Sequence, residues 1–234
     1  DSTIANVALP HMQSGMGATL DTVTWVLTSY ILASAVAIPI TGWIADRIGS
    51  RNLFLLSIAG FTISSLLCAT ASNLEMLVFY RVMQGLSGAF VMPLSQTVML
   101  DINPPKNHPR AMAIWGMGIM IAPIMGPIIG GYLTENFSWQ WIFLINVPLG
   151  IIAFVMLWTL LPSRPIARRK FDLSGFLLFA IFIASFQLML DRGNSEDWFD
   201  SWEIIIEFGI AASALWIFSI HMATAKNPFL SRDL

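Results

Sequence analysis

Long apolar runs, each of about 20 residues, recur from one end of this 234-residue chain to the other. A helix of about 20 apolar residues crosses the ~30 Å hydrocarbon core of a bilayer. Of the residues, 56% are hydrophobic and only 11% are charged, a balance that soluble domains rarely have. The sequence therefore predicts an all-α membrane protein whose solvent is the lipid bilayer, with spans near 22–44, 53–71, 76–100, 112–133, 142–161, 173–190 and 204–223.

Lysine and arginine residues predict which ends of these spans face the cytoplasm, because positive residues near helix ends stay inside. Ten of them fall in alternate loops and in the tail, whereas the opposite loops hold only Arg192. The ten are Arg47, Arg51, Lys106, Arg110, Arg164, Arg168, Arg169, Lys170, Lys226 and Arg232. The net charge of −2 carries little information beside this local asymmetry, and nucleic-acid binding has no support.

The chain opens with an acid, Asp1, in a short apolar segment that we interpret as the second half of a first helix, residues 1–10. If Pro10 marks the outer end of that helix, Asp1 lies roughly 14 Å inward, near the bilayer midplane. A carboxylate there costs about 2.5–3.5 kcal/mol, so such a residue is by default functional. Asp1 is therefore the leading candidate for a functional group.

The loop between the first two complete spans combines glycines with charged residues: Gly42, Asp46, Arg47, Gly49 and Arg51. The glycines let the backbone turn tightly and approach a neighbour. The aspartate can cap or pair at a helix end, and the arginines can pair with acids across a bundle interface. A gate and a plain cytoplasmic turn both fit this pattern.

A second charged group, Arg81, lies inside a predicted span, about six residues or ~9 Å below the outer end at Glu75, so that it snorkels only partly. Gln84, one turn further on, and the small residues Gly85 and Gly88 indicate a polar face turned into the bundle. A permanently charged arginine can stabilise an ionised carboxylate and release it when the partner moves. The alternative is a structural arginine that pairs with backbone carbonyls.

Small residues every fourth position form a stripe along the fifth span, which lets a second helix approach closely. Two prolines interrupt that helix and predict a bend. Close packing alone explains the stripe as well as a seal between helices does. The stripe and its neighbours are Gly118, Ala122, Pro123, Gly126, Pro127, Gly130 and Gly131.

Together and in this order, these segments resemble the motifs of the major facilitator superfamily, specifically the 14-helix drug:proton antiporters of the EmrB/QacA kind. The loop from Gly42 to Arg51 resembles the signature Gly-x3-Asp-Arg-x-Gly-x-Arg, with Ser50 where a basic residue is usual. Arg81, Gln84 and Gly85 fit Arg-x2-Gln-Gly, and residues 126–131 fit the antiporter signature of the fifth helix. Residues 1–10 resemble the first-helix motif of the 14-helix branch.

Residues 139–148 and the Leu-Asp-Arg-Gly sequence at 190–193 lean towards the EmrB type, although Gln140 stands where many relatives carry arginine. The resemblance implies a six-helix transport bundle over 1–161 and a basic cytoplasmic linker over 162–172. Two additional spanning helices follow in 173–223, and 224–234 then leads to a second bundle absent from the chain.

The resemblance also implies a proton-coupled multidrug exporter in the bacterial cytoplasmic membrane, driven by the proton gradient without a cofactor or metal. Asp1 and Arg81 would couple protons, residues 42–51 would gate, and small apolar or cationic compounds would be the substrates. A periplasmic adaptor and an outer-membrane channel are the expected partners. The expected substrate cavity includes Asn6, Trp25, Tyr30 and Gln84.

Other functions stay open at this point. The fold also suits an exporter of one defined solute, lipid or siderophore, since fold does not determine cargo. A non-transporting membrane scaffold is a further alternative, but a scaffold needs no acid at the midplane. An enzyme is disfavoured because neither His-x-x-Glu-His nor Gly-x-Ser-x-Gly occurs. The single cysteine, Cys68, we interpret as packing or lipid-facing.

Overall fold

A computed structural model describes residues 2–162 and 171–225, and within these ranges the regular structure is entirely helical. The first half of the chain forms α1 (Ser2–Met16), α2 (Leu20–Ala37), α3 (Thr41–Ile48), α4 (Ser50–Ala69), α5 (Leu74–Gly88) and α6 (Val91–Asp101). The remainder forms α7 (His108–Asn136), α8 (Trp141–Leu144), α9 (Asn146–Leu160), α10 (Leu173–Arg192) and α11 (Trp202–Thr224).

Seven segments of the described residues are long and apolar enough to cross a membrane, which confirms the seven predicted spans. Three of them contain two consecutive α-helices, namely α2 with α3, α5 with α6, and α8 with α9. The seven segments are Thr22–Ile48, Ser50–Ala69, Leu74–Asp101, Pro105–Asn136, Trp141–Leu160, Leu173–Arg192 and Trp202–Thr224.

The first helix does not end at Pro10, so the expected outer end is wrong. The depth assigned to Asp1 was based on that end and stays a prediction. α1 runs through Pro10 to Met16. A proline removes one backbone hydrogen bond, a loss that packing against neighbouring helices can offset. Here Ala5, Ala8 and Met12 are fully buried on one face of α1, and they hold the helix on both sides of the proline. Asp1 itself lies outside the described residues.

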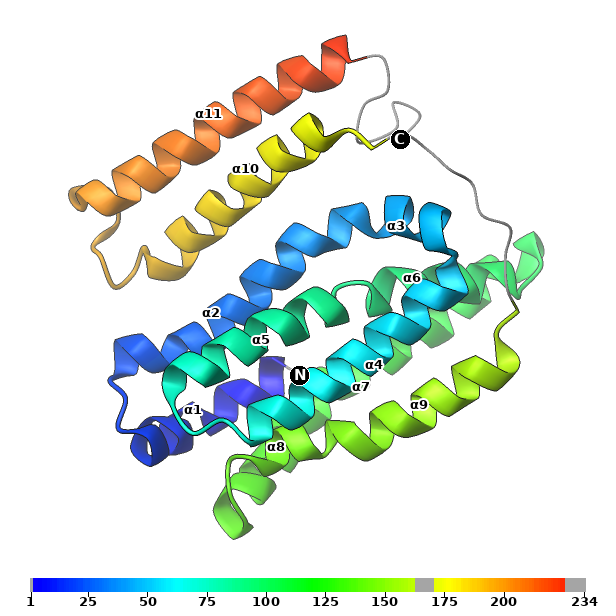
Figure 1. The fold of residues 1–234 in the computed structure, drawn as a ribbon, viewed down its shortest axis with the longest axis horizontal. Coiled ribbons are helices and arrows are strands. Elements are labelled where there is room, and N and C mark those ends of the chain that lie inside the picture. Colours follow the sequence, from blue (N-terminus) through cyan, green and yellow to red (C-terminus); the bar gives the residue numbers. More distant parts are fainter. Residues whose placement is uncertain (1, 163–170, 226–234) are drawn as a thin grey trace.

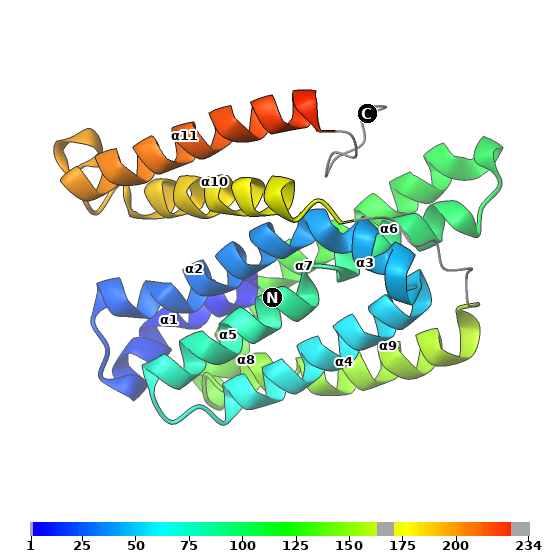
Figure 2. The same cartoon turned by 45° about the horizontal axis from the view of Figure 1, so that its top comes forward.

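Helices α1–α9 form a bundle, and α10 and α11 form a hairpin along one side of it (Figures 1 and 2). α10 packs on α2, and α11 lies on the far side of α10 from the bundle (Figure 1). The main buried cluster joins α1, α2, α4, α5 and the segment around α8. The predicted boundaries at 162–172 and 224–234 stay predictions, because 163–170 and 226–234 lie outside the described residues.

Polar contacts fasten the hairpin at the end where α10 begins and α11 finishes. The ring nitrogen Nε2 of His221 lies 2.8 Å from Oδ2 of Asp172. The same carboxylate caps α10 by accepting a hydrogen bond from the backbone N–H of Gly175 at 2.9 Å. Burial raises the pKa of Asp172, but the hydrogen bonds from Gly175, His221 and Ser174 outweigh it, so the pKa lies below its ordinary value.

A glycine lets α5 approach α2 closely. A Cβ atom added at Gly85 would lie 2.5 Å from the backbone carbonyl oxygen of Tyr30 and 3.0 Å from Cβ of Ala33. Ser34 uses this proximity, because its hydroxyl donates a hydrogen bond to the carbonyl oxygen of Gly85 at 3.1 Å. Backbone atoms cannot move aside as a flexible side chain can, so this contact requires glycine.

The lowered pKa of Asp172 predicts how the hairpin responds to acid. Its stabilisation is complete above the ordinary aspartate value of about 4 and is lost as the pH falls through the lower folded-state value. We expect hydrogen exchange of the α10 and α11 amides to accelerate over that acidic range. Asp172→Asn, which keeps a capping oxygen, should remove this acceleration, whereas Asp200→Asn in the α10–α11 turn should keep it. Identical pH profiles for the wild type and Asp172→Asn would contradict the assignment.

The close approach at Gly85 predicts a stability loss for a minimal substitution. Gly85→Ala should lower the free energy of unfolding by about 1–3 kcal/mol, because the methyl group overpacks against backbone. The matched control is Gly209→Ala in α11, where an added Cβ meets no described atom within 4 Å. That change should be neutral or slightly stabilising, since alanine favours a helix. Thermal unfolding of the full-length protein in detergent measures both, and equal effects would refute the packing argument.

Candidate functional site

The centre of the candidate site is Arg81 of α5, whose side chain is fully buried. Its Nε donates a hydrogen bond to the carbonyl oxygen of Val26 in α2 at 3.0 Å. Its Nη1 donates to Oε1 of Gln84 at 2.7 Å. The expected partial snorkelling is therefore wrong, because contacts with α2 and with the next turn of α5 hold the guanidinium inside the bundle. The contact with Val26 is to a backbone carbonyl, as expected if Arg81 has a structural role.

Two aromatic rings cover the guanidinium. Its carbon atom Cζ lies 4.1 Å from the ring centroid of Tyr30 in α2 and 5.7 Å from that of Phe143 in α8. A cation over an aromatic face gains about 2 kcal/mol when it is desolvated. The rings thus offset part of the cost of burying a charge, and Arg81 joins α5 to both α2 and α8.

Gln84 extends the polar centre towards α4. Its Oε1 accepts from Arg81 and also lies 3.7 Å from the sulfur of Cys68, which is fully buried. The lipid-facing alternative for Cys68 is therefore wrong, and the packing alternative is right. The amide nitrogen Nε2 of Gln84 is buried without a hydrogen-bond partner among the described residues. An unmet buried donor costs about 1–3 kcal/mol, so it is suited to an acceptor that arrives with a ligand.

Phe143 is held in place by polar contacts that the sequence analysis missed. The hydroxyl of Ser65 in α4 donates to the carbonyl oxygen of Phe143 at 2.9 Å, and Asn146 Nδ2 donates to Ser65 Oγ at 3.0 Å. These contacts lie where α8 gives way to α9 at Ile145, inside one predicted span. An asparagine within an apolar run was the available signal, because such a side chain needs a partner in a membrane.

The predicted gating loop is a turn of one residue. α3 ends at Ile48, Gly49 has φ of 91°, and α4 begins at Ser50. Only glycine adopts this φ without strain, which confirms the tight turn at Gly49. Gly42, in contrast, lies within α3, and an added Cβ there meets no described atom within 4 Å. The expected turn and close approach at Gly42 are therefore wrong.

The described contacts of the two arginines in this loop are with tryptophans. Arg47 lies over the ring of Trp43, with Cζ 5.3 Å from the ring centroid. Arg51 Nη2 donates to the carbonyl oxygen of Trp158 at 2.6 Å and lies over the same indole, joining α4 to α9. We expected these arginines to pair with acids, but among the described residues neither of them forms an ion pair. The gating role of the loop, Asp46 included, stays a prediction.

The small-residue stripe of α7 serves as a contact surface over only part of its length. A Cβ at Gly126 would lie 2.7 Å from Thr3 Oγ1, and one at Gly130 would lie 2.8 Å from Ile4 Cγ1. At Gly118 and Gly131, an added Cβ meets no described atom within 4 Å, and Ala122 is exposed. α1 therefore packs against one half of the stripe. α7 is continuous through Pro123 and Pro127, and their role in bending stays a prediction.

The four residues expected to line one substrate cavity lie in three places. Tyr30 and Gln84 meet at Arg81. Asn6 is exposed on α1. Trp25 lines a separate cavity between α2 and the α10–α11 hairpin. Only Tyr30 and Gln84 therefore join Arg81, and the expected partner Asp1 lies outside the described residues.

Comparison with known proteins assigns the family. The sequence model of the Major Facilitator Superfamily matches residues 1–229. A crystal structure of the human organic anion transporter MFSD10 (TETRAN) superposes on this chain with a TM-score of 0.55. The aligned region spans 93% of this chain and 61% of the MFSD10 chain. At 15% sequence identity, that likeness concerns the fold alone.

Three bacterial relatives align with the whole chain. They are a probable multidrug resistance protein EmrY of Escherichia coli, 46% identical, the multidrug export protein EmrB of Escherichia coli, 44%, and the fatty acid resistance protein FarB of Neisseria gonorrhoeae, 44%. The chain covers 46% of each of them, so it spans about half their length.

The contacts of Arg81 predict that no other cation replaces it. Arg81→Lys keeps the charge but cannot reproduce the fork that reaches both Val26 and Gln84. We expect it to lower the free energy of unfolding of the full-length protein by about 1–3 kcal/mol. Arg110→Lys, at an exposed position in α7, is the matched control and should stay within about 0.5 kcal/mol of the wild type. Thermal unfolding in detergent compares the two, and a tolerated Arg81→Lys would refute the role of the fork.

Proposed function

Because the chain belongs to the Major Facilitator Superfamily, we propose that it forms part of a proton-coupled multidrug exporter that moves small apolar or cationic compounds out of the cell. Its seven spans and its bacterial relatives place it as a multi-pass protein of the cytoplasmic membrane. The observation that carries the proposal is the buried guanidinium of Arg81, tied to Gln84, in a chain 44% identical to a multidrug export protein.

In the proposed cycle, Asp1 takes up a proton from outside and releases it inside. Apolar surroundings favour the neutral acid, whereas a nearby guanidinium favours the carboxylate. Arg81 supplies a permanent positive charge that packing keeps inside the bundle, which suits it to stabilising the ionised carboxylate. Each inward proton gains ~2.3 kcal/mol per 100 mV, enough to sustain roughly a 40-fold gradient of a neutral substrate.

The gate belongs to the same proposal. Asp46 and Arg47 would hold the cytoplasmic side closed, and the turn at Gly49 keeps α3 and α4 in a fixed relation there. Gly126 and Gly130 would seal α7 against α1, where they already pack against Thr3 and Ile4. The proton gradient would drive the cycle without a cofactor. A periplasmic adaptor and an outer-membrane channel would complete the export path.

A second candidate is the export of fatty acids. It is favoured by the 44% identity to a fatty acid resistance protein and by a buried positive centre that suits a carboxylate. Proteoliposomes that contain the full-length protein separate the two candidates. Efflux of cationic dyes without efflux of fatty acids supports the multidrug exporter, and the reverse supports the fatty acid exporter.

Asp1→Asn is the decisive variant, because asparagine cannot carry the proton. In proteoliposomes with an imposed pH gradient, we expect it to abolish gradient-driven substrate transport. Exchange of labelled for unlabelled substrate without a gradient should persist, since that exchange needs no net proton movement. Asp197→Asn, in the exposed outer turn, should leave both rates unchanged. Gradient-driven transport that survives in Asp1→Asn would overturn the assignment of Asp1.

A further inference from the structure

A cavity of about 560 Å³ lies between α2 and the α10–α11 turn. This volume falls within the range of small-molecule sites in proteins. The walls come from one face of α2, from the end of α10 and from the turn that follows. The lining residues that matter here are Thr24, Trp25, Thr28, Asp191, Asn194 and Glu196.

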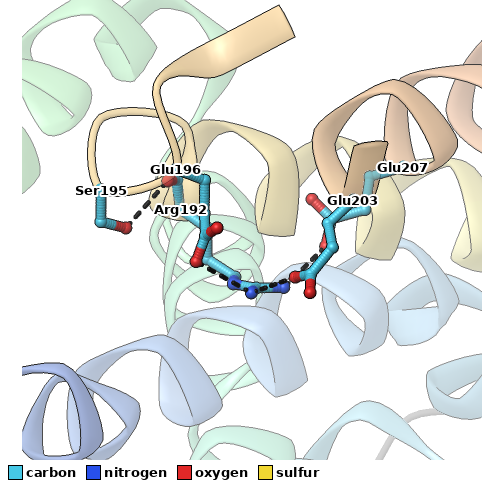
Figure 3. A network of polar contacts seen from close by, with 5 residues as sticks. All are labelled: Arg192, Ser195, Glu196, Glu203 and Glu207. Atoms are coloured by element: carbon cyan, nitrogen blue, oxygen red, sulfur yellow. Dashed lines mark hydrogen bonds and ion pairs between the residues drawn. The ribbon is translucent and has the colours of Figure 1, made fainter. Parts of the chain in front are cut away.

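The charged groups beside this cavity are predominantly acidic. The one positive side chain in the wall, Arg192, is shared among Glu203 at 2.5 Å, Glu207 at 3.3 Å and Glu196 at 3.3 Å (Figure 3). Three carboxylates thus surround one guanidinium, and Asp191 adds a fourth at the wall. The cavity therefore favours a cation over an anion or a neutral compound.

The carboxylate of Asp191 is anchored on the α2 side of the cavity. The hydroxyl of Thr28, a residue that is 3% exposed, donates a hydrogen bond to its Oδ2. Oδ1 accepts no hydrogen bond from a described residue, and the side chain is exposed. Asp191 is thus an oriented carboxylate that keeps one oxygen for a further partner.

An aromatic side chain completes the wall. Trp25 lies one turn before Thr28 on the same face of α2, and 40% of its surface is exposed. Indole is the best aromatic partner for a cation, and quaternary ammonium groups are typically bound by aromatic rings together with carboxylates. Arg81 offers the opposite environment, because its buried positive charge repels a cation.

We propose that this cavity binds an organic cation, an ammonium or phosphonium group, between the indole of Trp25 and the carboxylate of Asp191. The cation comes either from solution or from the ammonium headgroup of a lipid. This binding goes beyond the proposed export function. It is an equilibrium that needs no proton gradient and no transport.

The test uses the full-length protein in liposomes without any gradient, with Asn194→Cys as a reporter in the cavity wall. The natural Cys68 is buried, and cysteines outside this chain are replaced by serine. The rate at which an uncharged maleimide modifies the reporter is measured with and without tetraphenylphosphonium. Liposomes of phosphatidylglycerol alone and liposomes that also contain phosphatidylethanolamine separate a soluble cation from a lipid headgroup.

We expect saturable protection of the reporter by tetraphenylphosphonium. Trp25→Leu and Asp191→Asn should each raise the half-protecting concentration by about fivefold. Asparagine still accepts the hydrogen bond from Thr28, so the hairpin stays docked, and an unchanged modification rate without cation verifies this. The matched controls Trp202→Leu and Asp200→Asn, which do not line the cavity, should leave protection unchanged.

Protection by phosphatidylethanolamine alone, relieved by the same two variants, also supports the proposal and identifies the headgroup as the cation. The proposal is overturned if neither cation protects, if the two variants match the wild type, or if neutral triphenylphosphine oxide protects equally well. A failure here leaves gradient-driven export by the full-length protein untouched, and a failure of export leaves this binding untouched.

Discussion

The burial of one guanidinium constrains much of the bundle around it. Arg81 cannot be left unsatisfied in a membrane protein, so its partners must come from neighbouring helices. α2 supplies the carbonyl oxygen of Val26 and the ring of Tyr30, and α8 supplies Phe143. α2 reaches the guanidinium because Gly85 lets α5 approach its backbone. The hydrogen bond from Ser65 to Phe143 and the close approach at Gly85 thus both help to keep the charge of Arg81 inside the bundle.

The fold could be predicted further from the sequence than the site. The length and apolarity of a span are fixed by the bilayer itself, so the seven spans could be read directly. The end of α1 could not, because packing of Ala5 and Ala8 overrides the local effect of Pro10. Likewise, nothing in α7 alone shows that α1 covers Gly126 and leaves Gly118 without a contact.

Within the site, Arg81, Gln84 and Tyr30 could be found from their residue types, since each is polar or amphipathic within an apolar run. The error was to place Trp25 with Tyr30. Five residues at 100° each put their side chains roughly 140° apart around a helix, so both cannot face one cavity. The ring of Phe143 could not be assigned from the sequence, because an apolar side chain beside a cation looks like any other core residue.

α2 therefore works as a common wall with a different electrostatic character on each side. One face holds Tyr30 against a permanent positive charge, and the other holds Trp25 and Thr28 beside carboxylates. A helix moves as a stiff rod, so a tilt that widens the space on one face narrows the space on the other unless the hairpin travels with it. If the hydrogen bond from the hydroxyl of Thr28 to Asp191 persists during such a tilt, the hairpin moves together with α2. If it breaks, the hairpin stays in place and α2 slides along it.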